Sequence, residues 1–253
     1  MDDWRDRAAD VAGWLGDARS VGVLTGAGIS TDSGIPDFRG PQGVWTKDPK
    51  AERMATLSHY LADPETRRRA WRNRLESPMW HAAPNDGHRA LVTLERRGTL
   101  AGIVTQNVDG LHQAAGNAPD VVVEVHGSAA ATRCVSCRER RPMEETLTRV
   151  RDGEDDPPCL RCGGILKSAT ISFGESLDPA VLARAEDIAM TVEVFVVAGS
   201  SLGVYPAAGL APTARHHGAR LVIVNLQPTP FDDIADAVLS GPLSEVLPAL
   251  TGA

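Results

Sequence analysis

The sequence predicts an α/β protein built on a doubly wound parallel sheet, joined to a smaller part. Short runs rich in Val and Ile recur along the chain and are too short for helices, as expected for strands buried on both faces. Helix-like segments separate most of these runs, an alternation typical of doubly wound sheets. Residues 48–84, which are charged and helix-like, and residues 129–167, which hold all four cysteines, depart from this pattern.

The predicted strands share one feature at their carboxyl ends. The runs are Val21–Leu24, Gly102–Thr105, Val121–Val125, Val192–Ala198 and Leu221–Val224, with helices expected over His88–Gly98 and Ala180–Met190. Each run is followed by glycines or small polar residues, in "TGAGIS", "TQNVDG", "HGS", "GSS" and "NLQ". Ligands of open parallel sheets bind beyond the carboxyl ends of the strands, so the five ends together predict a binding crevice.

Charge and hydropathy exclude several classes of protein. The 253 residues carry a formal net charge of −7, which argues against nucleic acid as the main ligand because phosphates require a basic surface. The first residues, "MDDWRDRAAD", lack the apolar core of a secretory signal. No run reaches the roughly 18 apolar residues of a membrane-spanning helix. We therefore expect a cytoplasmic protein without a membrane partner.

The four cysteines form two pairs, Cys134-x2-Cys137 and Cys159-x2-Cys162, with 21 residues between them. This spacing is typical of a tetrahedral four-cysteine zinc site. Two disulfides or a redox dithiol are the alternatives, which an intracellular location and the paired pattern disfavour. Four thiolates fill the coordination sphere, so we expect one structural zinc per chain with no open position for a catalytic water.

The stretch "TGAGISTDSGIPDFRG", Thr25 to Gly40, places four glycines and a proline around Asp37, Phe38 and Arg39. Glycines allow sharp turns and close approach of the backbone to a ligand, so we predict a loop that closes over a nucleotide. "TGAGIS" follows the first strand and is expected to open a helix whose N–H groups favour a phosphate. The dinucleotide fingerprint is incomplete, because Thr31 stands where its third glycine belongs.

Three polar residues at strand ends are candidates for chemistry. His126 ends the run "VVVEV", and an imidazole titrates near neutrality, so it can serve as a general base. A structural, hydrogen-bonding histidine is the alternative. Asn107 and Asp109 follow another strand, where they could bind a ribose or an amide or could cap a helix. His112 is expected to be a packing residue.

"GSSLG", Gly199 to Gly203, matches the G-x-S-x-G elbow of serine hydrolases and follows a predicted strand. That fold requires an acidic residue and then a histidine after the nucleophile. Only His216 and His217 follow Ser201, with no acidic residue before them, so the required chain order fails.

"GAGISTDSGIPDFRG", "TQNVDGLH", "HG" with the paired cysteines, "FGE" and "VIVN" occur in one order, and in this the chain resembles a sirtuin, a Sir2-family NAD-dependent protein deacylase. The resemblance spans roughly residues 20 to 250. It implies a Rossmann-type NAD-binding domain from residues 1–47, 85–128 and 168–253. It also implies a small domain, formed by a helical insertion at 48–84 and the four-cysteine zinc ribbon at 129–167.

The resemblance also implies roles for individual residues. His126 is the general base, removing a proton from a ribose hydroxyl of NAD, and Asn107 and Asp109 act beside it. Phe173, Gly174 and Glu175 form the strand that pairs with the backbone of the acyl-lysine substrate. The NAD-binding residues would be Gly26, Ala27, Gly28, Ser30, Asp37, Phe38, Arg39, Gln106, Asn107, Asp109, Gly199, Ser200, Ser201, Asn225 and Leu226.

Some positions depart from the common sirtuin pattern. Lys167 and Ser168 replace an arginine–proline pair before "FGE", and Trp71-x-x-Arg74 has Trp where succinyl-removing relatives have Tyr. "GPQGVWT" and "VIVNLQPT" are more similar to the branch of the mammalian chromatin sirtuins. The Trp at position 71 in place of that Tyr disfavours acidic acyl groups as substrates.

The sequence thus predicts an NAD-consuming protein-lysine deacylase, chiefly a deacetylase, that transfers the acyl group to ADP-ribose and releases nicotinamide. A mono-ADP-ribosyltransferase using the same site is the nearest alternative. A non-catalytic NAD-binding regulatory module is an alternative from another class, although it has no need of the base His126. A zinc-ribbon adaptor leaves the five-strand crevice unexplained.

Overall fold

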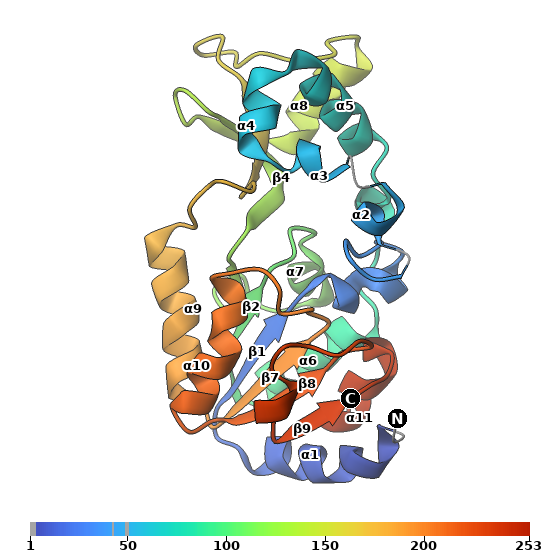
Figure 1. The fold of residues 1–253 in the computed structure, drawn as a ribbon, viewed down its shortest axis with the longest axis vertical. Coiled ribbons are helices and arrows are strands. Elements are labelled where there is room, and N and C mark those ends of the chain that lie inside the picture. The colour runs from blue at the N-terminus through green and yellow to red at the C-terminus, as the bar shows by residue number, and fades with distance from the viewer. Residues whose placement is uncertain (1–3, 42, 49–50) are drawn as a thin grey trace.

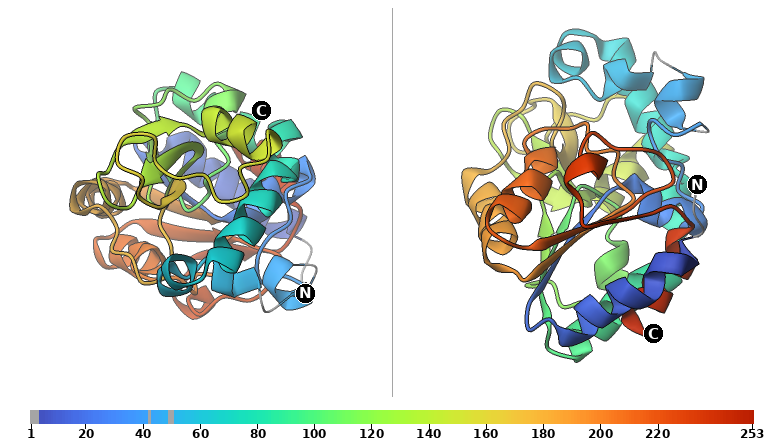
Figure 2. Two further views of the ribbon diagram at one scale, coloured as in Figure 1. Left: turned by 90° about the horizontal axis from the view of Figure 1, so that it is seen from above. Right: turned by 60° about the horizontal axis from the view of Figure 1, so that its bottom comes forward.

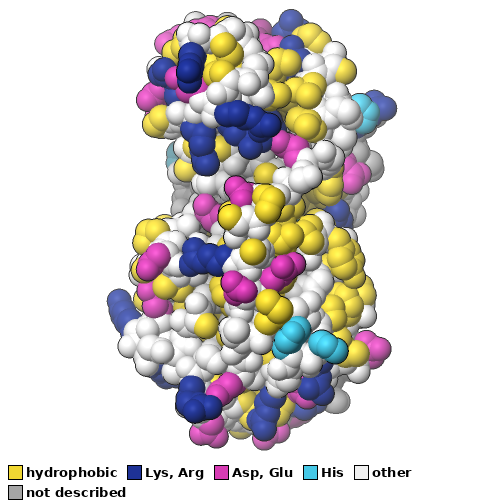
Figure 3. All heavy atoms as spheres, turned by 90° about the vertical axis from the view of Figure 1, so that its left-hand side faces the viewer, with side chains coloured by type: hydrophobic (Ala, Val, Ile, Leu, Met, Phe, Trp, Pro, Cys, Tyr) yellow, Lys and Arg dark blue, Asp and Glu magenta, His cyan; other side chains and the backbone are white. Residues whose placement is uncertain are grey.

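The computed structural model describes residues 4–41, 43–48 and 51–253, which form two parts arranged along the long axis of the molecule (Figure 1). The large part contains a parallel sheet, and the small part contains an antiparallel sheet with short helices. The surface narrows between the two parts, and basic and acidic side chains are intermixed on the face in Figure 3.

The sheet of the large part has the strand order β3-β2-β1-β7-β8-β9. Its neighbouring strands pair in parallel throughout the described residues. The chain moves outward from β1 in one direction and from β7 in the other, so the topological switch point lies between these two strands. The strands are β1 (Val21–Thr25), β2 (Leu100–Thr105), β3 (Val122–Glu124), β7 (Val194–Ala198), β8 (Arg220–Val224) and β9 (Ala237–Leu239).

Helices cover both faces of this sheet (Figure 2). One face packs against α1 (Arg5–Asp17), α6 (Asp86–Arg96) and α11 (Leu243–Thr251), and the other against α9 (Pro179–Thr191) and α10 (Leu210–His216). In β7, Val194 and Val196 face the first group of helices, whereas Phe195 and Val197 face the second. Successive strand side chains point to opposite faces, so burial of both faces explains the unbroken aliphatic runs.

The small part combines two segments that are distant in the sequence. Its sheet has the order β5-β4-β6, and its core consists of Trp71, Met143, Leu147, Val150 and Leu166 around Cys134 and Cys159. Its elements are α3 (Ala51–Met54), α4 (Leu57–Ala62), α5 (Pro64–Leu75), the 3-10 helix η2 (Pro78–His81), β4 (Gly127–Cys134), β5 (Arg140–Pro142), α8 (Met143–Arg151) and β6 (Leu166–Thr170). The short helix α2 (Val44–Lys47) lies between the two parts (Figure 1).

The predicted fold class is confirmed, and the five predicted strands are present with ends shifted by a few residues. Three details differ. The three-residue strand β9 was not predicted, because so short a run has no distinct pattern. "TGAGIS" opens a 3-10 helix, η1 (Ala27–Ser33), instead of an α-helix. The strands β4 and β6 cross the predicted boundaries at 128/129 and 167/168.

No helix in the described ranges is both long enough and apolar enough to cross a membrane.

Candidate active site

Three glycines bring together the carboxyl ends of β1 and β7, at the edge of the sheet where the binding crevice is expected. Gly28 donates its N–H to the carbonyl of Gly199 at 2.9 Å. A Cβ atom on Gly26 would lie 2.6 Å from the Gly199 oxygen, and one on Gly28 would lie 2.7 Å from the Gly199 Cα. Gly199 itself has a positive φ of 69°. The two strand ends approach so closely that a Cβ atom is excluded at each glycine. The N–H groups of Gly26 and Gly28 donate to the carbonyls of Ala198 and Gly199, so this contact holds the turn after β1 against the end of β7.

Ser30, Asn107 and Asp109, which come from two strand ends, form one hydrogen-bond network. The Ser30 hydroxyl donates to Asp109 Oδ2 at 2.7 Å, and Asn107 Nδ2 donates to Ser30 Oγ at 3.2 Å and to the Gly26 carbonyl at 3.1 Å. Asp109 Oδ1 also accepts the N–H of Leu111, the first residue of the short helix α7 (Leu111–Ala115), at 2.9 Å. The N-cap of α7 is Gly110, so Asp109 lies one residue before the cap position.

His126 follows β3 and is held in one orientation. Its Nδ1 lies 3.0 Å from the carbonyl oxygen of Gln106. A carbonyl can only accept, so Nδ1 carries the proton and Nε2 keeps its basic lone pair. Burial lowers the pKa of His126, and the hydrogen bond to Gln106 opposes that shift only in part. The imidazole is therefore neutral near pH 7 and can accept a proton at Nε2.

A second polar cluster lies beneath the crevice. His112 Nε2 is 2.9 Å from the Thr25 hydroxyl, which donates to the Thr105 hydroxyl at 2.8 Å, and Thr105 Oγ1 accepts the N–H of Asn107 at 3.1 Å. Burial lowers the pKa of His112 to about 3 and that of neighbouring His88 to about 4. His112 is buried, as predicted, and it links the core to the loop that carries Asn107.

The loop with Asp37, Phe38 and Arg39 packs on α2. Phe38 is 45% exposed, and its ring centroid is 4.7 Å from that of Trp45. The guanidinium of Arg39 lies 4.6 Å from the same indole ring, and Asp37 Oδ1 accepts the N–H of Gly40 at 2.8 Å. Trp45, which was not assigned a role from the sequence, organises this loop.

The remaining candidates of the crevice differ in their contacts. Gln106 Nε2 donates to Ser200 Oγ at 2.8 Å, which joins the ends of β2 and β7. Ser201 is exposed, and so is the side chain of Leu226. Asn225 Nδ2 donates to the carbonyl of Gln227 at 2.7 Å. Ala27 is half-buried at the start of η1. All six candidates lie beyond carboxyl ends of strands of the large sheet.

Phe173, Gly174 and Glu175 form a turn instead of the predicted strand. Phe173 makes a single bridge to Thr56, and the Glu175 N–H bonds back to the carbonyl of Ser172 at 2.9 Å. Gly174 has a φ of 88°, which is incompatible with a regular strand. The side chain of Glu175 pairs with Lys167 and Arg133, so it is not free to contact a ligand.

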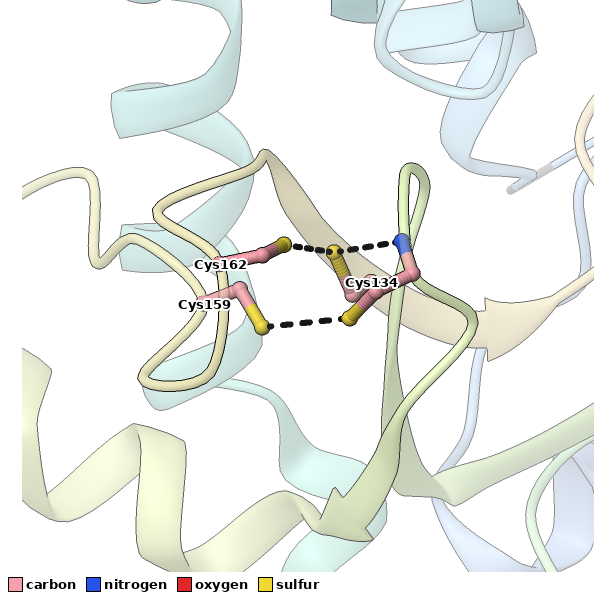
Figure 4. Close-up of side chains that lie close together, drawn as sticks. Cys134, Cys159 and Cys162 are labelled. Carbon is pink, nitrogen blue, oxygen red and sulfur yellow. Dashed lines mark hydrogen bonds between the residues drawn. The ribbon is translucent and has the colours of Figure 1, made fainter.

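The four cysteines converge in the small part, and Figure 4 labels three of them, Cys134, Cys159 and Cys162. Their sulfur atoms all lie within 4.8 Å of one another, with Cys134 to Cys162 at 3.5 Å and Cys137 to Cys159 at 3.7 Å. Zn–S bonds of about 2.3 Å in a tetrahedron place sulfurs about 3.8 Å apart. The donor set and its spacing therefore fit one zinc ion with a filled coordination sphere.

The serine hydrolase alternative fails in space as well as in chain order. His216 and His217 lie at the carboxyl end of α10, which runs from the end of β7 back to the start of β8. They therefore lie at the edge of the sheet opposite to Ser201.

Comparison with known proteins gives the family. A family model described as "Sir2 family" matches residues 26–206. The chain is 55% identical over 230 residues to "NAD-dependent protein deacetylase 2" of Streptomyces coelicolor, covering 91% of this chain and 95% of the relative. The chain belongs to the Sir2 family. It is also 39% identical to "NAD-dependent protein deacetylase 1" of Bradyrhizobium diazoefficiens, with 99% and 97% of the two chains covered.

Solved Sir2 structures have the same architecture as this sirtuin. One, described as "Structural Basis for the Mechanism and Regulation of Sir2 Enzymes", aligns with a TM-score of 0.89 at 38% identity over 98% of this chain and 97% of its own. Another is a Sir2 protein with a deacetylated p53 peptide and 3'-O-acetyl-ADP-ribose, with a TM-score of 0.89 at 35% identity over 96% and 97%. The resemblance stated from the motifs is thus confirmed.

Proposed function

We propose that this sirtuin is an NAD-dependent protein-lysine deacylase, chiefly a deacetylase, that transfers the acyl group from lysine to ADP-ribose and releases nicotinamide. The main support is the orientation of His126, whose Nδ1–H is bound to the Gln106 carbonyl so that Nε2 is free as a base. The names of the Streptomyces and Bradyrhizobium relatives, and the acetyl-ADP-ribose bound to a solved neighbour, support the same activity.

NAD supplies the ribose that receives the acyl group once nicotinamide has left. We assign the chain's residues as follows. Gly26, Ala27 and Gly28 are assigned to the pyrophosphate, as the resemblance to sirtuins implies, and the close contacts of the two glycines with Gly199 and Ser200 fix the shape of this turn. Asn107 and Asp109 orient the nicotinamide and its ribose, Phe38 excludes water above the sugar, and His126 Nε2 takes the hydroxyl proton. Ser30, Asp37, Arg39, Gln106, Gly199, Ser200, Ser201, Asn225 and Leu226 complete the NAD site.

Acyl-lysine peptides would bind along the turn of Phe173, Gly174 and Glu175. Gly174 offers main-chain groups that take no part in hydrogen bonds between described residues. An extended substrate can add to such groups by backbone pairing, which tolerates many sequences. Solved Sir2 structures with acetylated and propionylated peptides support a peptide substrate.

Zinc is assigned to Cys134, Cys137, Cys159 and Cys162 as a structural ion. We also keep the division into an NAD-binding domain and a small helical and zinc-ribbon domain, supported by the separate cores of the large and small parts. We place the protein in the cytoplasm, because a four-thiolate zinc site needs cysteines that stay reduced and the cytosol keeps them so.

The test is to incubate the protein with NAD and acetyl-, myristoyl- or succinyl-lysine peptides, following products by mass spectrometry. His126→Ala removes the base, and His217→Ala, which changes an exposed histidine at the opposite edge of the sheet, is the matched control. We expect nicotinamide, deacylated peptide and O-acyl-ADP-ribose from the wild type and the control, and neither deacylated peptide nor O-acyl-ADP-ribose above background from His126→Ala, because the base acts after nicotinamide has left.

Two outcomes would contradict the proposal. A gain of one ADP-ribose on protein without loss of any acyl group identifies an ADP-ribosyltransferase. Binding of NAD with no change in peptide or protein identifies a regulatory module.

A further inference from the structure

A buried group of charges lies directly behind the turn of Phe173 and Gly174. Glu175 Oε2 accepts from Lys167 Nζ at 2.6 Å, and Glu175 Oε1 accepts from the guanidinium of Arg133 at 2.6 Å. The exposed fractions of the three side chains are only 12%, 3% and 23%. These residues, which we call the charge clamp, come from β4, β6 and the turn.

The charge clamp closes the loop that follows β6. Lys167 Nζ also donates to the carbonyl of Thr170 at 2.5 Å, and Glu175 Oε2 also accepts the N–H of Ser172 at 2.9 Å. The ammonium thus joins the last residue of β6 to the residue that ends the turn. The shape of the intervening loop, 171–174, depends on this link.

Phe173, inside the closed loop, is hydrogen-bonded to the segment between α3 and α4 of the small part and contacts α2 through its ring. Its N–H donates to the carbonyl of Ala55 at 2.8 Å, and its carbonyl accepts the N–H of Leu57 at 3.0 Å. Its ring centroid is 5.5 Å from that of Trp45, which in turn contacts Phe38 of the proposed NAD loop. A displacement of the turn would therefore change a surface that faces both the peptide and NAD.

The electrostatics make Lys167 the sensitive member of the charge clamp. Burial lowers the pKa of the Lys167 ammonium, and the hydrogen bond and charge of Glu175 oppose that shift. Burial alone would raise the pKa of Glu175, but the hydrogen bonds and charges of Lys167, Ser172 and Arg133 bring it below its ordinary value. Removing one partner of a buried ion pair leaves an uncompensated charge, so the loop would rearrange to solvate Glu175.

We propose that Lys167 is a positioning residue for the acyl-peptide substrate: with Arg133 it holds the Glu175 carboxylate and so fixes Phe173 and Gly174 in the shape that binds a peptide backbone. The inference rests on the proposed deacylase function. It identifies a residue that touches neither substrate nor NAD and yet sets the affinity for peptide.

The test compares Lys167→Met, which keeps length but removes charge, with Lys167→Arg, which keeps the charge. Arg151→Met is the matched control, because Arg151 belongs to the small part but pairs with Glu144 at its surface, with 47% of its side chain exposed. Binding of an acetyl-lysine peptide without NAD is measured by calorimetry, and kcat and both KM values by product formation. Zinc content and thermal unfolding report whether each variant is folded.

We expect Lys167→Met to weaken peptide binding and to raise the peptide KM by about tenfold or more, the size expected for loss of a charge-assisted hydrogen bond. Its kcat at saturating peptide and its KM for NAD should change less than about twofold, a smaller effect than one lost hydrogen bond produces. Lys167→Arg should restore most of the peptide affinity, and Arg151→Met should match the wild type.

Equal peptide affinity in Lys167→Met and the wild type would overturn the inference. Loss of stability and kcat together, with the peptide KM unchanged, would also overturn it, because that pattern indicates a merely structural role. If Lys167→Met fails to fold, the peptide affinities of Lys167→Arg and Glu175→Gln are measured instead. Unchanged peptide affinity in Glu175→Gln would then overturn the inference. Absence of deacylation by the wild type despite peptide binding would count against the proposed function and leave this inference standing.

Discussion

The crevice of the large part and the cysteine site of the small part are both polar sites, but they are stabilised in different ways. The crevice rests on a sheet buried on both faces by two large hydrophobic clusters, so the strand ends that form it are held by the core of the fold. The small part has one minor cluster, and two of its members, Cys134 and Cys159, are themselves proposed metal ligands. The hydrophobic core of the large part positions the residues proposed to bind NAD, whereas in the small part the proposed zinc ion itself stabilises the fold.

Removal of zinc is the strongest test of this contrast. Structural zinc contributes about 10–16 kcal/mol of apparent binding free energy in zinc-finger peptides, which exceeds what so small a core can replace. We expect a chelator or Cys134→Ser to abolish hydrogen-exchange protection across residues 127–170, while β1 and β7 keep theirs. Persisting protection over 127–170 in zinc-free protein would show that the small core suffices alone.

Gly199→Ala tests how tightly the crevice is built. A Cβ atom there would lie 2.6 Å from the main-chain nitrogen of Ile29, and the φ of 69° adds strain. We expect a loss of at least about 3 kcal/mol in unfolding free energy, with weakened NAD binding. The matched control is Gly218→Ala, which has a φ of 92° but nothing within 4 Å of a Cβ, so about 1 kcal/mol is expected. Urea unfolding distinguishes the two, and equal losses would mean that packing at Gly199 is loose.

Acid should weaken the large part through the buried histidines beneath the crevice. The pKa of His88 is lowered to about 4 and that of His112 to about 3, chiefly by burial. In the unfolded chain both imidazoles have the ordinary histidine pKa of 6.5, so below pH 6.5 the unfolded chain binds more protons than the folded one. The contribution of the two neutral histidines to the unfolding free energy is therefore fully present above pH 6.5 and decreases as the pH falls toward 4. Each histidine contributes about 1.4 kcal/mol per pH unit in this window. His112→Asn should reduce the slope of unfolding free energy against pH by an amount that corresponds to about one proton. An unchanged slope would show that His112 does not cause the loss of stability in acid.

Local patterns in the sequence were enough to predict most of the fold and the zinc ligands. Aliphatic runs identified five strands because burial on both faces leaves little choice of residue, and the paired CxxC spacing brings the ligands together whatever surrounds them. The roles of Gly26 and Gly199 could be named only by resemblance, because their contact depends on β1 and β7 being neighbours in the sheet. The charge clamp was not predicted for a related reason: Arg133, Lys167 and Glu175 meet through strand pairing and a turn, neither of which leaves a local signal.

The smallest predicted effect is that of replacing one of two leucines that are exposed to nearly the same extent. Leu226 beside the crevice is 64% exposed, and Leu160 between two zinc-site cysteines is 62% exposed. Replacing either with Ala should change unfolding free energy by no more than about 0.5 kcal/mol, because neither side chain is packed. If Leu226 covers NAD, Leu226→Ala should weaken NAD binding by about 1 kcal/mol, or about fivefold, through lost apolar contact. Leu160→Ala should leave NAD binding unchanged. Calorimetric titration with NAD separates the two, and equal affinities would remove Leu226 from the proposed NAD site. The two leucines then differ only in their effect on NAD binding, because both contribute equally little to the stability of the folded chain.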